Sequence, residues 1–485
     1  MTLRSPALTG FALAALLGLP AAAAPAAEPE RAGLAPAEAY RLVGDLFSER
    51  RRVRRAARAR LIEAADPTVA PALVDAVFFN TAGRAETVEV LEALLDVRHG
   101  SDYHAWLEEI GGREEITPKP GYLRFKAEQF ARIDPSFGKF LSPEHRFAIR
   151  PEEIVWGGVV KDGIPALRNP KAIPAAAAEY LDDEETVFGV AVGGEAMAYP
   201  RRILDWHEMV NDVVGGRAVT LAWCSLCGSG ILYDGEIAPG ELYTFGTSGL
   251  LYRSNKLMYD HQTRSLWSSM TGEPVAGPLT ERPEARRPRL TVLPMVVTTW
   301  GEWRARHPDT EVLSLDTGHR RDYRPGAAYG AYFASDDLMF PVWKRPDREV
   351  LERKDWIWAV EAGGFRKAYP VDALLVRPVV NDIVGGVPIV LVTDPDSEAV
   401  RAYDRGRRTL RATDDPDVLA DVTSGERFRL TEEALVPVTA GEPEEGEAAD
   451  EAVHLPRRVG YRAFWFGWYA FFPGTEVWRP QVPPA

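Results

Sequence analysis

The stretch that decides the fold is residues 187–234, VFGVAVGGEAMAYPRRILDWHEMVNDVVGGRAVTLAWCSLCGSGILYD, because a similar stretch occurs again later in the chain. It aligns without a gap onto residues 357–404, and about a third of the aligned positions are identical. A second matching pair, 300–312 and 465–477, follows in the same order. Two blocks repeated in one order indicate a duplicated unit.

We expect copy one over residues 150–320 and copy two over residues 340–480. Within each copy, short apolar runs alternate with glycine, proline, asparagine and aspartate, a pattern typical of β-strands joined by turns. The residues that both copies share are mainly these turn-forming types and aromatic residues. We therefore expect the shared residues to form a scaffold, and the residues found in only one copy to carry the chemistry.

Residues 34–145 have a different pattern. Apolar residues recur at helical spacing over 40–47, 69–79 and 88–95, which predicts amphipathic helices packed in a helical-repeat-like array. The expected fold class is therefore α+β, with an N-terminal α-helical domain followed by two tandem duplicated β-rich lobes.

The first 27 residues are typical of a secretory signal peptide. Arg4 precedes an apolar run over 7–19, and small residues at 21–27 offer cleavage sites. That run is shorter than the about 20 apolar residues needed to span a bilayer. We find no segment of the mature chain that is long and apolar enough to do so. We predict export to the periplasm or the extracellular space, an oxidising environment for cysteines.

The charge balance narrows the class of partner. The chain has 57 basic and 71 acidic residues, a net charge of −14, which argues against general nucleic-acid binding. The sequence contains neither a nucleotide-binding motif nor the Gly-x-Ser-x-Gly motif of hydrolases. The expected partner is an unidentified small molecule or another envelope protein.

Copy one holds the only two cysteines of the chain, Cys224 and Cys227. Their counterparts in copy two are Asp394 and Ser397, so the pair is particular to copy one. Two thiols at this spacing can cycle between dithiol and disulfide, bind a soft metal, or form a structural disulfide.

His207 is also particular to copy one, since Arg377 stands at the equivalent position. We take Cys224, Cys227 and His207 as the candidate site, with His207 as a base or an extra metal ligand. Asp212 is expected to orient His207 and completes the predicted catalytic set. Asp260 is a second candidate for that role.

Three mechanisms remain open for this site. The sequence Trp-Cys-x-x-Cys after a strand is the thioredoxin pattern, but Gly228-Ser229-Gly230 and a predicted strand follow it, so we do not expect a thioredoxin fold. Alternatively, the two thiolates with His207 or His261 hold zinc, copper or iron in a three-ligand site with an open position. In the third mechanism, a disulfide pins a tight turn.

The chain resembles the domain of unknown function family 3179. The resemblance covers roughly residues 105–480. The motifs that carry it are 158–165, 198–200, 206–212, 224–228, 248–252 and 258–260. It implies an exported protein with its site at the cysteine loop and His207, Asn211 and Asp212 nearby, and it implies no particular reaction. His261 and Arg264 stand where arginine and glycine are common in such proteins, which weakens His261 as a ligand.

We therefore expect an exported protein with a thiol-redox or thiolate–metal centre at Cys224 and Cys227. The alternative is a non-catalytic envelope binding or scaffold module in which the two cysteines form a structural disulfide.

Overall fold

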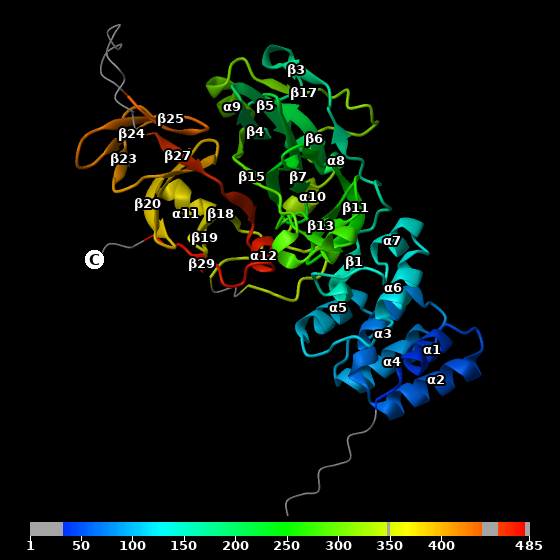
Figure 1. The fold of residues 1–485 in the computed structure, drawn as a ribbon. Coiled ribbons are helices and arrows are strands. Elements are labelled where there is room, and N and C mark those ends of the chain that lie inside the picture. Colours follow the sequence, from blue (N-terminus) through cyan, green and yellow to red (C-terminus); the bar gives the residue numbers. More distant parts are fainter. Residues whose placement is uncertain (1–32, 347–349, 439–453, 481–485) are drawn as a thin grey trace, which may run out of the picture.

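The computed structural model describes residues 33–346, 350–438 and 454–480. The predicted signal peptide, 1–27, lies outside these residues. An N-terminal helical region is followed by a β-rich region of several sheets, which confirms the expected α+β class (Figure 1). No helix in the described part of the chain is both long and apolar enough to cross a membrane.

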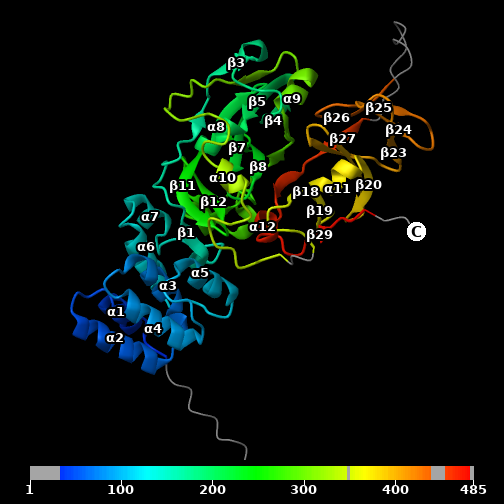
Figure 2. The same cartoon turned by 180° about the vertical axis from the view of Figure 1, so that it is seen from behind.

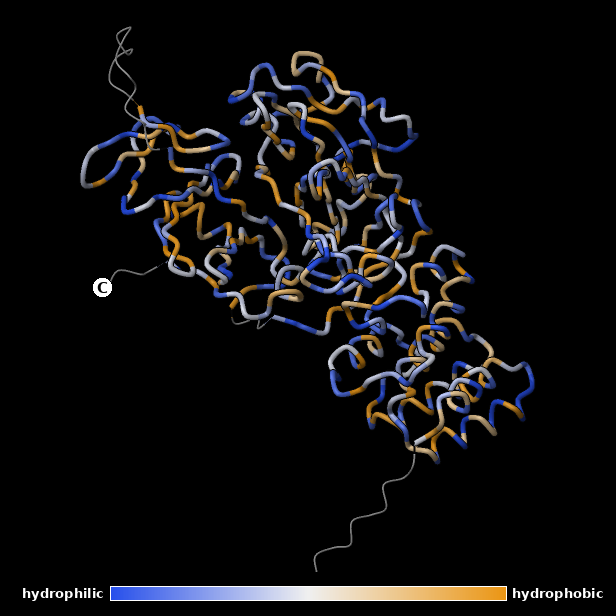
Figure 3. The backbone as a smooth tube through the Cα atoms, in the orientation of Figure 1, coloured by the Kyte–Doolittle hydropathy of each residue, from blue (hydrophilic) through white to orange (hydrophobic). Residues whose placement is uncertain are grey.

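The helical region occupies one end of the molecule (Figures 1 and 2). Its helices are α1 (Pro36–Asp45), α2 (Arg51–Ala64), α3 (Ala70–Phe79), α4 (Arg84–Leu95), α5 (Tyr103–Gly112), α6 (Tyr122–Phe130) and α7 (Pro135–Phe140). α3 is the central helix, and all its residues from Ala70 to Val77 are buried. Along α2, hydrophilic and hydrophobic residues alternate, as expected of a helix with one buried face (Figure 3).

Local sequence explains where several of these helices begin. The side chain of Asp102 accepts a hydrogen bond from the Ala105 N–H at the start of α5. Asp134 accepts one from Ser136, and Pro135 occupies the first position of α7, where its missing N–H costs nothing.

Residues 150–320 contribute to three large sheets and to a small two-stranded one, β10-β9 (Glu241–Leu242 and Glu236–Ala238). One is β1-β11-β12-β13-β14, made from Ile154–Trp156, Phe245–Tyr252, Asn255–Asp260, Leu266–Ser268 and Pro274–Ala276. The second is β16-β4-β5-β17-β3, made from Val296–Thr299, Thr186–Val192, Glu195–Pro200, Glu311–Leu313 and Ala172–Pro174. The third contains β2 (Leu167–Arg168), β6 (Met209–Val214), β7 (Arg217–Cys224), β8 (Ser229–Asp234) and β15 (Val292–Leu293).

This third sheet continues into the C-terminal half. It runs on through β28 (Tyr461–Phe464), β18 (Trp356–Ala362), β19 (Phe365–Pro370) and β29 (Glu476–Val477). β8 and β28 meet where Gly230 pairs with Arg462. The cysteine hairpin β7–β8 therefore lies where the two halves join, beside the red helix α12 (Trp465–Tyr469) in Figures 1 and 2.

An eight-stranded sheet completes the C-terminal half. Its order is β20-β21-β22-β27-β26-β25-β24-β23, made from Val379–Val384, Val387–Thr393, Val400–Asp404, Leu455–Arg458, Ala434–Pro437, Arg427–Leu430, Val418–Asp421 and Leu410–Ala412.

The two halves share a succession of elements. β4, β5, α8 (Arg201–His207), β6, β7 and β8 follow one another as β18, β19, α11 (Val371–Val376), β20, β21 and β22 do later in the chain. The Tyr199 hydroxyl donates to Asp212 over 2.9 Å, and the Tyr369 hydroxyl donates to Asp382 over the same distance. These shared polar residues bond to one another in the same way in both halves.

Candidate functional site

The two cysteines occupy a tight turn between two strands. Cys224 ends β7 and pairs with Ser229, the first residue of β8. Gly228 in the turn has φ of 59°, and a Cβ there would lie 2.6 Å from the Trp356 ring, so both its conformation and its surroundings require glycine. The turn enters β8 directly, as predicted, so neither cysteine begins a helix as in the thioredoxin pattern.

Both cysteines are buried as free thiols, with exposed fractions of 1% for Cys224 and 0% for Cys227. Their side chains approach the carbonyl oxygen of Ser254, which lies 3.2 Å from the Cys227 Sγ and 4.0 Å from the Cys224 Sγ. The two sulfurs also lie within hydrogen-bonding reach of each other. This is the arrangement of a dithiol that can close to a disulfide.

The surroundings shift the pKa values of the two thiols in opposite directions. Burial acts to raise the pKa of Cys224, but the hydrogen bond from Cys227 and the charge of Lys256 outweigh burial, so the pKa is lowered overall. Burial and the neighbouring Cys224 sulfur both raise the pKa of Cys227. Of the two sulfurs, Cys224 is therefore the one that loses its proton more readily.

Lys256, on β12, supplies a positive charge that the sequence analysis missed. It is only 4% exposed, and its Nζ donates to the carbonyl oxygens of Glu208 and of Trp223, the latter over 2.7 Å. Burial lowers its pKa to about 8, against the opposing charges of Glu208 and Cys224. The only sequence signal is a lysine that directly precedes the apolar run Leu257 to Tyr259, between two of the family-like motifs.

Two buried carboxyl groups complete the polar surroundings. Burial raises the pKa of Glu208, and the charge of Lys256 opposes this shift. Burial also raises the pKa of Asp205 to about 6, although its carboxylate accepts a 2.8 Å hydrogen bond from the Trp223 Nε1. The site thus contains two cysteine sulfurs, a lysine amino group and two carboxyl groups, all largely shielded from water.

The cysteine turn is covered from two sides. We call residues 318–346, which link the two halves and include α10 (Gly330–Phe333), the strap. The Tyr332 hydroxyl of the strap donates to the Leu226 carbonyl over 2.7 Å, and Lys354 donates to the Tyr332 carbonyl over 2.6 Å. From the C-terminal half, the Phe464 N–H donates to the Cys227 carbonyl over 2.8 Å. Reagents reach the sulfurs only if this cover opens.

His207 contacts the strap. It is fully buried, with its Nδ1 lying 2.8 Å from the Pro165 carbonyl oxygen and its Nε2 lying 2.6 Å from the Tyr323 hydroxyl. Burial lowers its pKa to about 4, so the ring is neutral at physiological pH. Among the described residues, no group of three or more His, Cys, Asp or Glu side chains could hold a metal ion. The structure therefore brings Cys224 and Cys227 together, without His207 as a third ligand.

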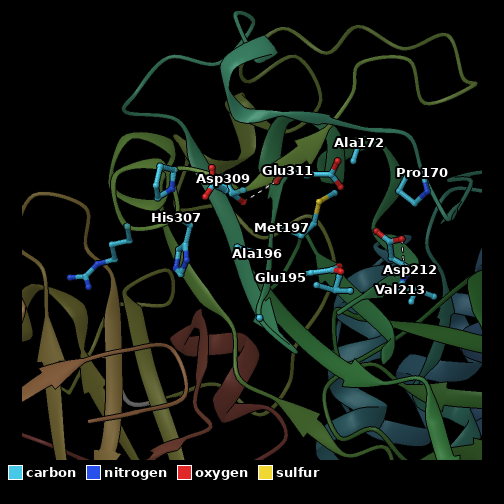
Figure 4. A pocket seen from close by; sticks show the side chains of 15 residues that line it. Pro170, Ala172, Glu195, Ala196, Met197, Asp212, Val213, His307, Asp309 and Glu311 are labelled. Atoms are coloured by element: carbon cyan, nitrogen blue, oxygen red, sulfur yellow. Dashed lines mark hydrogen bonds between the residues drawn. The ribbon is translucent and has the colours of Figure 1, made fainter. Parts of the chain in front are cut away.

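Asp212 lies away from the cysteines. It pairs with Val219, five residues before Cys224 along β7 and so about 16 Å away along the strand. Figure 4 shows its side chain in the wall of a cavity of about 600 Å³, near Glu195 and Glu311. Burial and the charge of Glu311 raise its pKa, while two hydrogen bonds oppose the shift.

The other candidates from the sequence organise turns. Asp260 accepts hydrogen bonds from the Trp267 Nε1 at 2.8 Å and from the Ser265 N–H at 3.1 Å. The Nδ1 of His261 lies 2.8 Å from the Thr244 carbonyl oxygen. Neither side chain hydrogen-bonds to a cysteine in the described part of the chain.

Comparison with known proteins identifies one family. The family described as "Protein of unknown function (DUF3179)" matches residues 161–475, a segment that includes the cysteine turn, Lys256 and the strap. No curated protein and no solved structure matches the chain.

Proposed function

The chain belongs to the DUF3179 family of proteins of unknown function, and from that premise we propose that its cysteine turn is a thiol–disulfide redox centre. The observation that carries the proposal is the placement of two buried free cysteines in one tight turn, next to the Lys256 amino group that bonds to the Trp223 carbonyl. The lowered pKa of Cys224 and the raised pKa of Cys227 agree with it. Dithiol redox sites need one sulfur that attacks as a thiolate and a second that stays protonated until it resolves the intermediate.

The proposed reaction requires a substrate disulfide and no cofactor. The Cys224 thiolate attacks one substrate sulfur and forms a mixed disulfide, and the other substrate sulfur leaves as a thiolate. Cys227 then attacks the Cys224 sulfur, and the second substrate sulfur leaves as a thiol with the proton of Cys227. Two electrons pass from the cysteine pair to the substrate, and the reverse sequence oxidises a substrate dithiol.

Lys256 has a positioning role in this scheme. Its ammonium group is held between two backbone carbonyl oxygens, where it stabilises the Cys224 thiolate without contacting the substrate. α10 of the strap must move away before a substrate reaches the sulfurs, because the Tyr332 hydroxyl of α10 is hydrogen-bonded to the Leu226 carbonyl in the cysteine turn.

A purely structural disulfide is the alternative proposal, in a chain that serves as a binding or scaffold module. A ring closed between residues 224 and 227 restricts the unfolded chain little, because loop-closure entropy grows with loop length. Such a staple also gives no reason for a buried lysine beside the sulfurs, since burying a charge costs free energy. The redox proposal accounts for Lys256 and is therefore preferred. Stoichiometric metal in the purified protein would instead favour a two-thiolate metal centre.

We further infer that the C-terminal half is a duplicate of the half that carries the cysteines. The common succession of elements and the equivalent Tyr–Asp hydrogen bonds support this inference. Lacking cysteines, the duplicate serves to cover the turn through Phe464 and α12. We place the reaction in the exported compartment that residues 1–27 predict.

The test is a titration of the thiolate by its ultraviolet absorbance, which does not require reagents to reach the buried sulfurs. Lys256→Met should raise the pKa of Cys224, because it removes a positive charge beside the thiolate. Glu208→Gln should lower that pKa further, since it removes a negative charge. Lys354→Met is the matched control, because Lys354 also donates to two backbone carbonyl oxygens, but those belong to Tyr332 and Ser335 of the strap and not to residues beside Cys224. Equal titration curves for all four proteins would contradict the role of Lys256.

A further inference from the structure

A second cavity, of about 320 Å³, lies between the cysteine turn and the C-terminal half. It is lined by the two equivalent turns, with Trp223 and Gly228 from the first and Asp396 to Glu398 from the second. Phe188 and Trp356 add aromatic walls. Its volume lies at the lower end of the range for small-molecule sites, and its lining combines this aromatic wall with a larger number of polar and charged side chains.

Two arginines supply the positive charge of this cavity. The Arg462 side chain is 11% exposed, lies over the Trp356 ring and forms an ion pair with Glu398. Arg201 stacks on the Phe333 ring at 5.1 Å and forms no ion pair with any residue in the described part of the chain. Burial lowers the pKa of Arg462 and the charge of Arg201 adds to this, while Glu398 and Asp372 oppose the shift, so the two guanidinium groups repel each other.

We propose that this cavity binds a carboxylate carried on an aromatic or other apolar body, with Arg201 as the principal donor. The planar guanidinium offers two parallel N–H donors that match a carboxylate, and the aromatic walls receive the body of the ligand. Binding also relieves the repulsion between Arg201 and Arg462. This site is independent of the redox proposal, because its evidence is the cavity and its arginines.

The rim of the cavity favours a singly charged ligand. Glu184 and Asp396 also line it, and both are exposed. Together with Glu398 they set three carboxylates against the two arginines that line the cavity, so a second negative charge on the ligand would meet net repulsion. The chemistry therefore points to a monocarboxylate.

Calorimetric titration of the full chain with 3-phenylpropionate tests the site, with 3-phenylpropanamide as the uncharged probe. We expect the carboxylate to bind and the amide to bind at least about tenfold more weakly, since a charge-assisted hydrogen bond is lost. Arg201→Gln should weaken carboxylate binding by a similar factor. Arg304→Gln, which removes an exposed arginine outside the cavity, should leave the affinity unchanged.

A second variant changes the affinity in the opposite direction. Glu398→Gln removes the carboxylate that now occupies Arg462, so the affinity for 3-phenylpropionate should rise about threefold or more. Absence of carboxylate binding, equal binding of the amide, or an unchanged affinity in Arg201→Gln would each overturn the proposal. A weaker affinity in Glu398→Gln would overturn the part assigned to Arg462.

Discussion

Replacing Cys227 by serine traps Cys224 in a mixed disulfide, whereas replacing Cys224 by serine leaves no reacting thiol. The reason is the opposite shift of the two pKa values, which makes Cys224 the attacking sulfur and Cys227 the sulfur that resolves the intermediate. Serine differs from cysteine by one atom, so both variants should keep the tight turn. Mass spectrometry after incubation with hydroxyethyl disulfide measures the adduct.

Ser225→Ala is the matched control for these variants. Ser225 is a buried residue of the same turn and carries a hydroxyl in place of a thiol, so its loss removes no sulfur. This variant should form the Cys224–Cys227 disulfide as the parent chain does, with no stable adduct. Equal adduct formation in the Cys224→Ser and Cys227→Ser variants would contradict the assigned order of attack.

Replacing Arg401 by methionine should lower the free energy of unfolding by about 3–5 kcal/mol. Arg401 is 3% exposed, and its guanidinium lies 3.0 Å from the Glu302 carboxylate and 2.7 Å from that of Glu432. Glu302 belongs to α9 (Trp300–Arg306) in the first half of the chain, so the arginine links the two halves. Its loss leaves two carboxylates close together and largely buried. Chemical denaturation at neutral pH measures the difference.

The effect of this substitution should depend on pH. Burial acts to raise the pKa of Glu432, but Arg401 and its neighbours outweigh burial and hold it well below its usual range. Such a carboxyl group stabilises the fold above its unfolded pKa and loses that contribution as pH falls towards its folded pKa. The difference between the parent and Arg401→Met should therefore shrink in acid. Arg408→Met, which removes a partly exposed ion pair with Glu426, should cost less than about 1 kcal/mol.

If Arg401→Met lowered the free energy of unfolding as little as Arg408→Met, this would contradict the inference that Arg401 stabilises the contact between the two halves.

The sequence predicted the order of the two regions and the setting of the cysteine turn, because both depend on local patterns. Helical spacing marked the N-terminal region, and the glycines after Cys227 excluded a helix there. The same Asn and Asp residues recur in both halves with matching hydrogen bonds, such as Asn211 to the Phe245 backbone and Asn381 to the Leu410 backbone.

Lys256 could not be predicted, because its role depends on which strands lie together. β12 belongs to a different sheet from β7, and only the packing of the two sheets brings the Lys256 ammonium to the Trp223 carbonyl. Tyr332 lies more than a hundred residues after the turn that it covers. For the same reason the sequence grouped His207 and Asp212 with the cysteines, whereas the fold directs His207 to the strap and Asp212 to another cavity.

The most direct test of the redox centre is the reduction potential of the Cys224–Cys227 pair. The purified chain is equilibrated with buffers of reduced and oxidised glutathione, and the fraction of disulfide is measured by mass spectrometry after rapid trapping of free thiols. We predict a reversible two-electron transition at a potential above about −300 mV, the range of catalytic rather than structural disulfides. Two results would contradict the account. In one, the pair never forms the disulfide; in the other, the disulfide is reduced only at potentials below about −300 mV.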